Sequence, residues 1–359
     1  MGESSLIYVC PICRSNVELL PEEYVCPNGH RFRTHLGIPD FRTFDPPYVS
    51  KDEEARRVEL LMESYESMSF RELVSLYQRE VAPEDEPETL VEQHIRYRST
   101  AAQRGTLRVD KLSRLLSAME LSFESKSRAL DLGCGTGGHL VALGREYEQV
   151  VGVDIALEEL ILARKNLQEN GLANVDLVCA CSEALPFRDS SFGFCHADGV
   201  VEHVESHRDF LAETYRVLGP KGILSFSSPN RFTILKEPHV QVWGVGFLPK
   251  RLASAYVSLM RGIPYEAKDP MSFLELNRLL RETYKRDFRI FTIPGTTNMS
   301  EPGSTTRGRA YRKLHRIPLI KKLMRLIETC FLPVFEVIAL RKADEAAPFG
   351  SSPREVDTG

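Results

Sequence analysis

A glycine-rich turn followed by an isolated carboxylate is the feature of this chain with the clearest chemical meaning. The turn, Gly133-Cys-Gly-Thr-Gly-Gly138, follows the apolar run Ala129–Leu132 and opens a helical pattern. Glycine lets the backbone bend sharply and lets a ligand lie against it, because no Cβ stands in the way. A second apolar run ends about twenty residues further on at Asp154, where a carboxylate can accept hydrogen bonds from both hydroxyls of a ribose. These residues predict an adenosine-bearing cofactor.

Two classes of cofactor fit the glycines. Gly133, Gly135 and Gly138 match the G-x-G-x-x-G pattern of dinucleotide binding, and Gly133, Gly135 and Gly137 match G-x-G-x-G. Asp131 favours one of them. Its carboxylate is poorly placed beside a pyrophosphate but well placed near the ammonium group of S-adenosylmethionine. We therefore expect S-adenosylmethionine, with a nicotinamide-dependent dehydrogenase as a more distant alternative.

Motifs after the glycine turn narrow the class further. Ser182-Glu-Ala-Leu-Pro-Phe187, then Glu202-His203-Val204 and a segment ending in Leu-Gly-Pro-Lys-Gly222, follow in that order. Over roughly residues 126–230 this succession resembles the class I S-adenosylmethionine-dependent methyltransferases. The resemblance implies three sets of cofactor contacts: the methionine end on Asp131, Gly133, Gly135 and Gly137, the ribose hydroxyls on Asp154, and the adenine beside Cys181 and Ser182.

Two positions depart from that family. Cys181 stands where many members place an aspartate that holds the adenine amino group. Gly193 stands where the fourth strand usually begins with aspartate. Both departures concern the adenine contacts and the local strand geometry, and neither removes the site for the sulfonium.

Strand and helix patterns alternate through residues 126–342, which predicts an α/β fold with a doubly wound parallel sheet. As in the family, we expect seven mostly parallel strands, closed by Phe288–Ile293 and by an antiparallel Pro333–Leu340. The clearest helix is Leu157–Asn170, ended by Gly171. Four regions are predicted: a zinc ribbon at 1–45, a helical cap or linker at 46–125, the methyltransferase domain at 126–342 with a substrate insertion at about 230–286, and a disordered tail at 343–359.

Composition restricts the remaining classes. A chain of 359 residues with 42% hydrophobic content can bury a full α/β core and carry appendages. Its net charge of −4 gives no support for a general nucleic-acid binder. No apolar run suits a membrane span or a signal peptide, and the eight cysteines do not form a disulfide pattern. We therefore expect a cytoplasmic protein.

The N-terminal segment carries four candidate metal ligands: Cys10, Cys13, Cys26 and His30. Two short loops that each offer a pair of soft or borderline ligands suit tetrahedral zinc. Because so short a segment buries little apolar surface, bound metal would supply its folding free energy. His35 is the alternative fourth ligand, but the Cys-x₃-His spacing makes His30 the better choice.

The role of this ribbon has two further interpretations. Its spacing resembles the zinc finger of ribosomal RNA guanine-N1 methyltransferases, and Gly37-Ile-Pro-Asp-Phe41 resembles small zinc-ribbon proteins that activate partner methyltransferases. Through Asp45 the segment has few cations for phosphate contacts, and Glu202-His203 differs from the RNA enzymes. We therefore expect a structural cap first and an RNA reader second.

The acceptor is expected in the insertion after the fifth strand, because ligands bind outside the carboxyl ends of the strands. Residues 230–249 hold the only tryptophan, two glycines and His239, which favours an aromatic-lined pocket over a plain helix. Methyl transfer to a hydroxyl needs a base near neutral pH, so His239 and His203 are the candidate catalytic residues. A metal-binding Glu-x-x-Glu-His motif is incomplete at Glu202-His203, so a catalytic metal is not favoured.

The segment between Arg307 and Lys342 contains ten Lys or Arg residues and only two acids, and apolar residues recur among them at helical spacing. This pattern indicates a lid helix or, less simply, a peripheral helix at an anionic membrane surface.

The favoured function is O-methylation of a small molecule, saccharide or lipid-linked intermediate. The alternatives are an RNA base methyltransferase and a non-catalytic module that binds cofactor and docks a partner.

Overall fold

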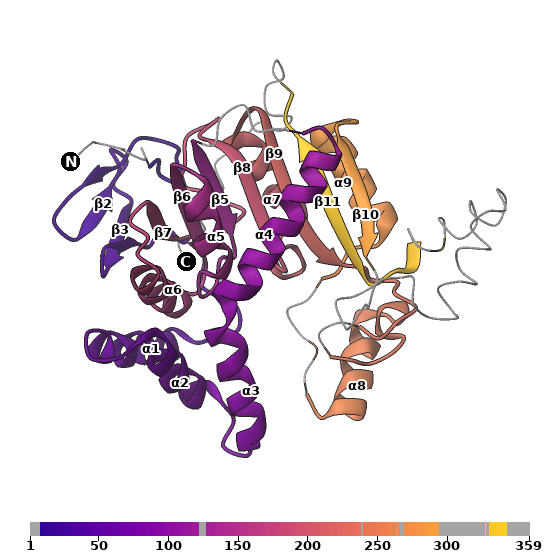
Figure 1. The fold of residues 1–359 in the computed structure, drawn as a ribbon, viewed down its shortest axis with the longest axis horizontal. Helices are drawn as coiled ribbons and strands as arrows, with labels where there is room; N and C mark the ends of the chain where they lie inside the picture. Colours follow the sequence, from indigo (N-terminus) through magenta and orange to yellow (C-terminus); the bar gives the residue numbers. More distant parts are fainter. Residues whose placement is uncertain are drawn as a thin grey trace. The chain divides into compact units, whose positions relative to one another are not determined.

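The computed structural model describes residues 8–121, 127–237, 240–263, 265, 269–293, 327 and 330–342. Two compact units are distinguished within the chain. Unit 1 comprises residues 1–197, 208–224 and 340–359, and unit 2 comprises residues 198–207 and 225–339. Each unit is described by itself below, with the ribbon drawn in Figure 1.

A seven-stranded sheet in the order β10-β11-β9-β8-β5-β6-β7 confirms the predicted Rossmann-like architecture. β5 pairs in parallel with β6 and β8, and β6 pairs in parallel with β7. β11 is antiparallel to β10, as expected. Arg341, the residue directly after β11, donates its N–H to Gly222 O in β9. The strands are β5 Arg128–Leu132, β6 Gln149–Asp154, β7 Val175–Cys179, β8 Phe192–Asp198, β9 Leu218–Pro229, β10 Phe288–Ile293 and β11 Val334–Leu340.

Three helices of unit 1 accompany these strands: α5 Gly138–Glu146, α6 Leu157–Glu169 and α7 His207–Val217. The inner strands are continuous apolar runs, and Leu130, Val151 and Val153 are fully buried. Such runs are typical of parallel strands that are covered on both faces. The α6 helix ends at Asn170, and Gly171 follows with φ +68°, as the sequence predicts.

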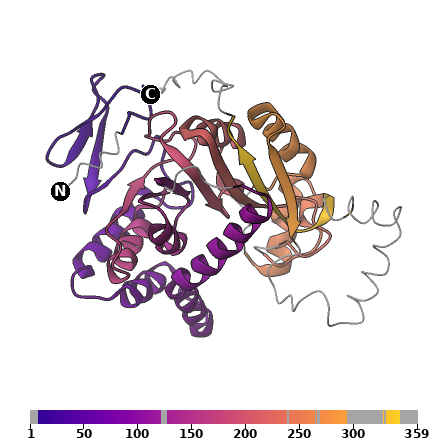
Figure 2. The ribbon, with the colours of Figure 1, turned by 45° about the horizontal axis from the view of Figure 1, so that its top comes forward.

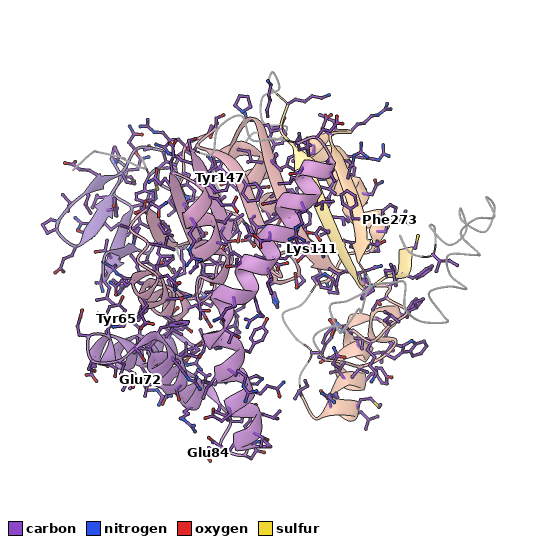
Figure 3. All side chains as sticks on the ribbon, in the orientation of Figure 1. Tyr65, Glu72, Glu84, Lys111, Tyr147 and Phe273 are labelled. Atoms are coloured by element: carbon purple, nitrogen blue, oxygen red, sulfur yellow. The ribbon has the colours of Figure 1, made fainter. Side chains whose placement is uncertain are left out.

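Four helices precede the sheet: α1 Lys51–Ser64, α2 Phe70–Val81, α3 Glu88–Ser99 and α4 Ala101–Ala118. α1 and α2 pack against α6, where Tyr65 Oη donates to Gln168 Oε1 at 2.8 Å (Figure 3). α4 packs against α5 so closely that a Cβ added at Gly105 would lie 2.1 Å from Gly138 O. The two helix backbones are therefore in direct contact beside the glycine turn.

The N-terminal ribbon consists of four short antiparallel strands: β1 Glu18–Leu19, β2 Glu23–Val25, β3 Arg31–His35 and β4 Ile38–Pro39. Figure 2 shows it in indigo beside the β7 edge of the sheet. Phe41 N–H donates to Cys179 O at 2.7 Å, and Val9 N–H donates to Pro186 O at 3.0 Å. The ribbon is thus bonded through its backbone to the methyltransferase-like part of unit 1.

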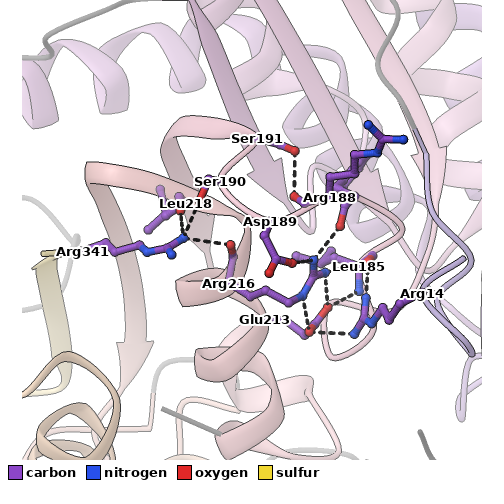
Figure 4. Close-up of polar contacts among 11 residues, drawn as sticks. Arg14, Leu185, Arg188, Asp189, Ser190, Ser191, Glu213, Arg216, Leu218 and Arg341 are labelled. Carbon is purple, nitrogen blue, oxygen red and sulfur yellow. Dashed lines mark hydrogen bonds and ion pairs between the residues drawn. The ribbon is translucent and has the colours of Figure 1, made fainter. Parts of the chain in front are cut away.

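Side chains strengthen the same attachment. Arg14 donates to Glu213 at 2.8 Å and to the carbonyl of Leu185 at 2.9 Å. Glu213 also pairs with Arg216 at 2.7 Å and accepts from Leu185 N–H (Figure 4). Because Leu185 lies in the loop that begins at Cys181, the ribbon also fixes the loop expected beside adenine.

Unit 2 contains η2 Val245–Phe247, α8 Lys250–Arg261 and α9 Phe273–Tyr284. One face of α8 places Ala253 and Val257 in a small core with Val240, Val242 and Val245. The described part of the insertion is therefore a folded element with a turn at Gly244 and two separate helices, α8 and α9, rather than one continuous helix.

Candidate functional site

The glycine turn between β5 and α5 is left-handed at several positions. Gly135 has φ +48°, and a Cβ added there would meet nothing within 4 Å. Gly137 has φ +78°, and its added Cβ would lie 3.3 Å from Ala163 Cβ in α6. The two glycines therefore serve different purposes: Gly137 lets α6 approach, and Gly135 leaves open space in which a ligand can meet the backbone.

Asp154 ends β6 next to this turn. Its carboxylate accepts from Gly135 N–H at 2.8 Å and from Ala156 N–H at 3.0 Å. Burial raises the pKa of Asp154 to about 6, although these two backbone donors act in the opposite direction. A charged, hydrogen-bonded carboxylate beside an open backbone turn is suited to a ribose diol.

Asp131 is the penultimate residue of β5 and is 1% exposed. His139 Nδ1 lies 4.0 Å from its Oδ2, and the rings of His139 and His196 meet edge to face at 4.9 Å. Ligand atoms of these three residues lie within 4.8 Å of one another, so the group could bind a cation or an ammonium group. Neither histidine was predicted as a site residue from the sequence. His139 directly follows the glycine turn, and His196 pairs with Asp131 in the register of β5 and β8.

On the expected adenine side, Cys181 is buried and Ser182 is half-buried. The thiol of Cys181 donates to Phe44 O at 3.6 Å, and burial raises its pKa. A neutral thiol directed at the backbone is not equivalent to the aspartate that stands at this position in many class I methyltransferases.

The last residues of the ribbon also reach the end of β6. Arg42 donates to Ile155 O at 3.2 Å, next to Asp154. Its guanidinium pairs with Asp40 and with Glu54, each at 2.6 Å. This contact could not be predicted from the sequence, because Arg42 lies more than a hundred positions from Ile155 and in no motif.

The two candidate bases have different outcomes. His203 ends the short η1 helix Val201–His203 in unit 2 and is exposed. The preceding Glu202 is buried, and its carbonyl accepts from Asp269 N–H at 2.7 Å. His239 lies outside the described residues, as do the tail at 343–359 and most of the basic segment at 307–342.

The four predicted metal ligands lie together. Cys13 Sγ is 3.7 Å from Cys26 Sγ, and His30 Nδ1 is 3.2 Å from Cys26 Sγ and 3.5 Å from Cys10 Sγ. Tetrahedral zinc with Zn–S bonds of about 2.3 Å separates its sulfur ligands by about 3.8 Å. The group contains His30 and not His35, so its dimensions and its donor set both suit zinc.

Part of the chain is similar to known proteins. Residues 130–226 match the model of a methyltransferase domain, Methyltransf_11. The chain is 33% identical over 129 residues to the ubiquinone biosynthesis O-methyltransferase of Roseobacter denitrificans, covering 34% of this chain and 50% of that protein. It is 32% identical over 110 residues to the demethylmenaquinone methyltransferase of Listeria welshimeri, covering 29% and 47%. The chain thus spans about half the length of these relatives.

Among solved structures, the chain is similar to that of a putative sarcosine dimethylglycine methyltransferase from Galdieria sulphuraria. The identity is 21%, the coverage is 66% of this chain and 86% of that one, and the TM-score is 0.42.

Within the part of the chain that the structure describes, no helix combines the length and apolar character needed to cross a membrane.

Proposed function

We propose that this protein is a methyltransferase that moves the methyl group of S-adenosylmethionine to a hydroxyl of its acceptor. The observation that carries the proposal is the pairing of the open turn at Gly135 with the carboxylate of Asp154, 2.8 Å apart through the Gly135 N–H. Asp131 would hold the ammonium group, and Gly133, Gly135 and Gly137 would follow the methionine chain. The sulfonium of the cofactor supplies the reactive methyl group. The residues of the chain bind the cofactor, orient it and exclude water.

Titration of the purified protein tests the cofactor assignment. We expect S-adenosylhomocysteine to bind in calorimetry and NAD not to bind. Tight binding of NAD would instead indicate a dehydrogenase. Retained S-adenosylhomocysteine binding without turnover, together with a co-purifying protein, would indicate the non-catalytic module.

The acceptor is proposed to be a small molecule, saccharide or lipid-linked intermediate with a nucleophilic hydroxyl. The names of the relatives from Roseobacter denitrificans and Listeria welshimeri support quinone precursors within this class. An untargeted search for metabolites that gain the mass of one methylene in the presence of protein and cofactor would identify the acceptor. Methylated nucleosides in a digest of tRNA or rRNA would support the RNA alternative instead.

Proton removal is proposed to involve His239, with His203 as the competing base. An imidazole with a pKa near 6.5 is neutral and basic at working pH, and a positioned base contributes about 10²–10⁴ in rate. We expect His239→Ala to lower kcat at least about 10²-fold and to leave cofactor affinity within about two-fold. A large kcat loss in His203→Ala, with only the acceptor KM changed in His239→Ala, would reverse the two roles.

The ribbon is proposed to hold one structural zinc ion through Cys10, Cys13, Cys26 and His30. Its distances support this assignment, and its backbone bonds to Cys179 and Pro186 make it a cap on the sheet edge. A zinc-dependent RNA contact would require the ribbon to lose affinity for RNA when the metal is removed.

A further inference from the structure

Unit 2 exposes an unusual number of large apolar side chains in residues 230–263. We call the residues that share this property the insertion surface: Ile234, Leu235, Trp243, Phe247, Leu252, Leu259, Met260 and Ile263, with exposed fractions between 43% and 84%. Single exposed apolar residues are common, but a group of this kind within one short segment is typical of an interaction site.

The exposed side chains of α8, the helix labelled in Figure 1, lie on a different face from its buried ones. Ala253 and Val257 are buried against the small core of the insertion. Leu252 and Leu259, two turns apart, share another face and are 58% and 84% exposed. The helix is therefore apolar on a second face, and this face has no counterpart in the core of the insertion.

Within residues 230–263 the exposed charges have one sign. Lys236, Arg251 and Arg261 are exposed. The only acid between residues 230 and 263 is Glu237, which is 5% exposed. Exposed leucine, methionine and tryptophan side chains combined with Lys and Arg, without exposed acids, are the pattern of helices that lie in the interface of an anionic bilayer.

Other occupants fit less well. The chain between Arg307 and Lys342 is rich in cations, and so is the segment 230–263 of a second copy, so each would be repelled electrostatically. An RNA site would rely on stacking aromatic rings, whereas most of the exposed apolar residues are aliphatic. We propose that the insertion surface binds the anionic surface of a lipid bilayer, with α8 lying in the membrane interface. This inference does not depend on the proposed methyl transfer, although it would bring the enzyme to acceptors dissolved in a membrane.

Trp243 provides a direct readout, because it is the only tryptophan of the chain and is 62% exposed. The full-length protein is mixed with vesicles of phosphatidylcholine alone or with added phosphatidylglycerol. We expect co-sedimentation and a blue shift of Trp243 emission with the anionic vesicles only, both weakened by salt as charges are screened. Neither measurement requires cofactor or turnover, so failure here is distinguishable from failure of the methyltransferase proposal.

Variants test whether this surface is responsible. Leu259→Ser should lower partitioning into anionic vesicles about ten-fold, because it removes one inserted leucine. Arg251→Glu should lower it at low salt and have little effect at high salt. Leu107→Ser, at a leucine that is 70% exposed in α4, is the matched control and should bind like the unmodified protein.

Several outcomes would overturn the proposal. The first is unchanged vesicle binding by both insertion variants, or no binding by the unmodified protein. A clear fall in unfolding temperature in Leu259→Ser would mean that another segment of this chain covers the surface. A dimer in solution that Leu259→Ser dissociates would assign it to a second copy, and tRNA binding lost in Arg251→Glu would assign it to RNA.

Discussion

At the glycine turn of unit 1, the carboxylate of Asp154 is half-buried and bonded to backbone donors, whereas in residues 230–263 of unit 2 large apolar side chains are exposed. Asp154 has partners at 2.8 and 3.0 Å, but Leu259 is 84% exposed. A buried carboxylate is costly unless it is bonded, so the first arrangement indicates a preorganised site for one particular ligand. Single exposed leucines are common, but a group of exposed apolar side chains is typical of an interaction site, so the second arrangement indicates a binding surface. If both proposals hold, the cofactor and the lipid bilayer are bound by regions built on opposite principles.

The largest effect is expected from the metal ligands of unit 1. Purified protein should contain about one equivalent of zinc by elemental analysis, and Cys26→Ser should abolish it. Structural zinc supplies about 10 kcal/mol or more of folding free energy in small domains, so the ribbon should unfold and free the edge of β7. Proteolysis within residues 8–45 would report this unfolding.

Cys330→Ser is the matched control, because this cysteine is far from the ribbon in sequence and outside the four-residue group. Full zinc content in Cys26→Ser would contradict the ligand assignment. If unfolding of the ribbon left cofactor affinity unchanged, the hydrogen bond from Arg42 to Ile155 O would not contribute to cofactor binding.

The contact between α4 and α5 should give the next largest effect. At Gly105, the Cβ of alanine would lie 2.1 Å from Gly138 O, a backbone atom that cannot turn aside. We expect Gly105→Ala to lower the free energy of unfolding by about 3 kcal/mol. At Gly144 in α5 the same substitution meets side-chain ends at 3.0 Å or more, and it should be nearly neutral in denaturant titration. Equal effects at both positions would mean that α4 can move away from the glycine turn.

The comparison also shows what the sequence could predict. The glycine turn, Asp154 and the Cys-x-x-Cys pair are local patterns whose residue types are dictated by their own geometry, and the structure brings their members together. The inner strands followed from apolar runs for the same reason, whereas the total of seven strands was expected from the family resemblance. Arg42 and His196 reach the site only through the fold, by a contact with Ile155 and by strand register with Asp131. Exposure of Leu252 and Leu259 was not predictable either, because an apolar face at helical spacing looks the same whether it is buried or not.

Removing the carboxylate of Asp154 tests the proposed cofactor site more directly. A charge-assisted bond to a ribose diol contributes roughly 1.5–3 kcal/mol, so Asp154→Ala should weaken S-adenosylhomocysteine binding about ten- to a hundred-fold in calorimetry. Asp176→Ala, which removes an exposed carboxylate from β7, is the charge-matched control and should bind normally. Equal losses in both variants would indicate a general charge effect instead of a diol contact.

The smallest effect is a pH dependence that moves cofactor binding and stability in opposite directions. Burial raises the pKa of Asp154 from 3.8 to about 6, and only the ionised carboxylate accepts from both ribose hydroxyls. At pH 5 about a tenth of the carboxylates would be ionised, so affinity for S-adenosylhomocysteine should fall about ten-fold relative to pH 8. Because the folded-state pKa is raised, the contribution of Asp154 to the stability of the cofactor-free protein is fully present below about pH 4 and is lost as pH rises through about 6.

Glu158, whose pKa burial raises to about 7, adds a stability change of the same sign, so the difference between the unmodified protein and Asp154→Asn isolates Asp154. This variant should flatten both profiles between pH 4 and 6. A cofactor affinity that is independent of pH in the unmodified protein would show that a neutral Asp154 side chain is sufficient for binding. Cofactor binding would then rely on the backbone of the glycine turn at Gly135 rather than on the carboxylate of Asp154.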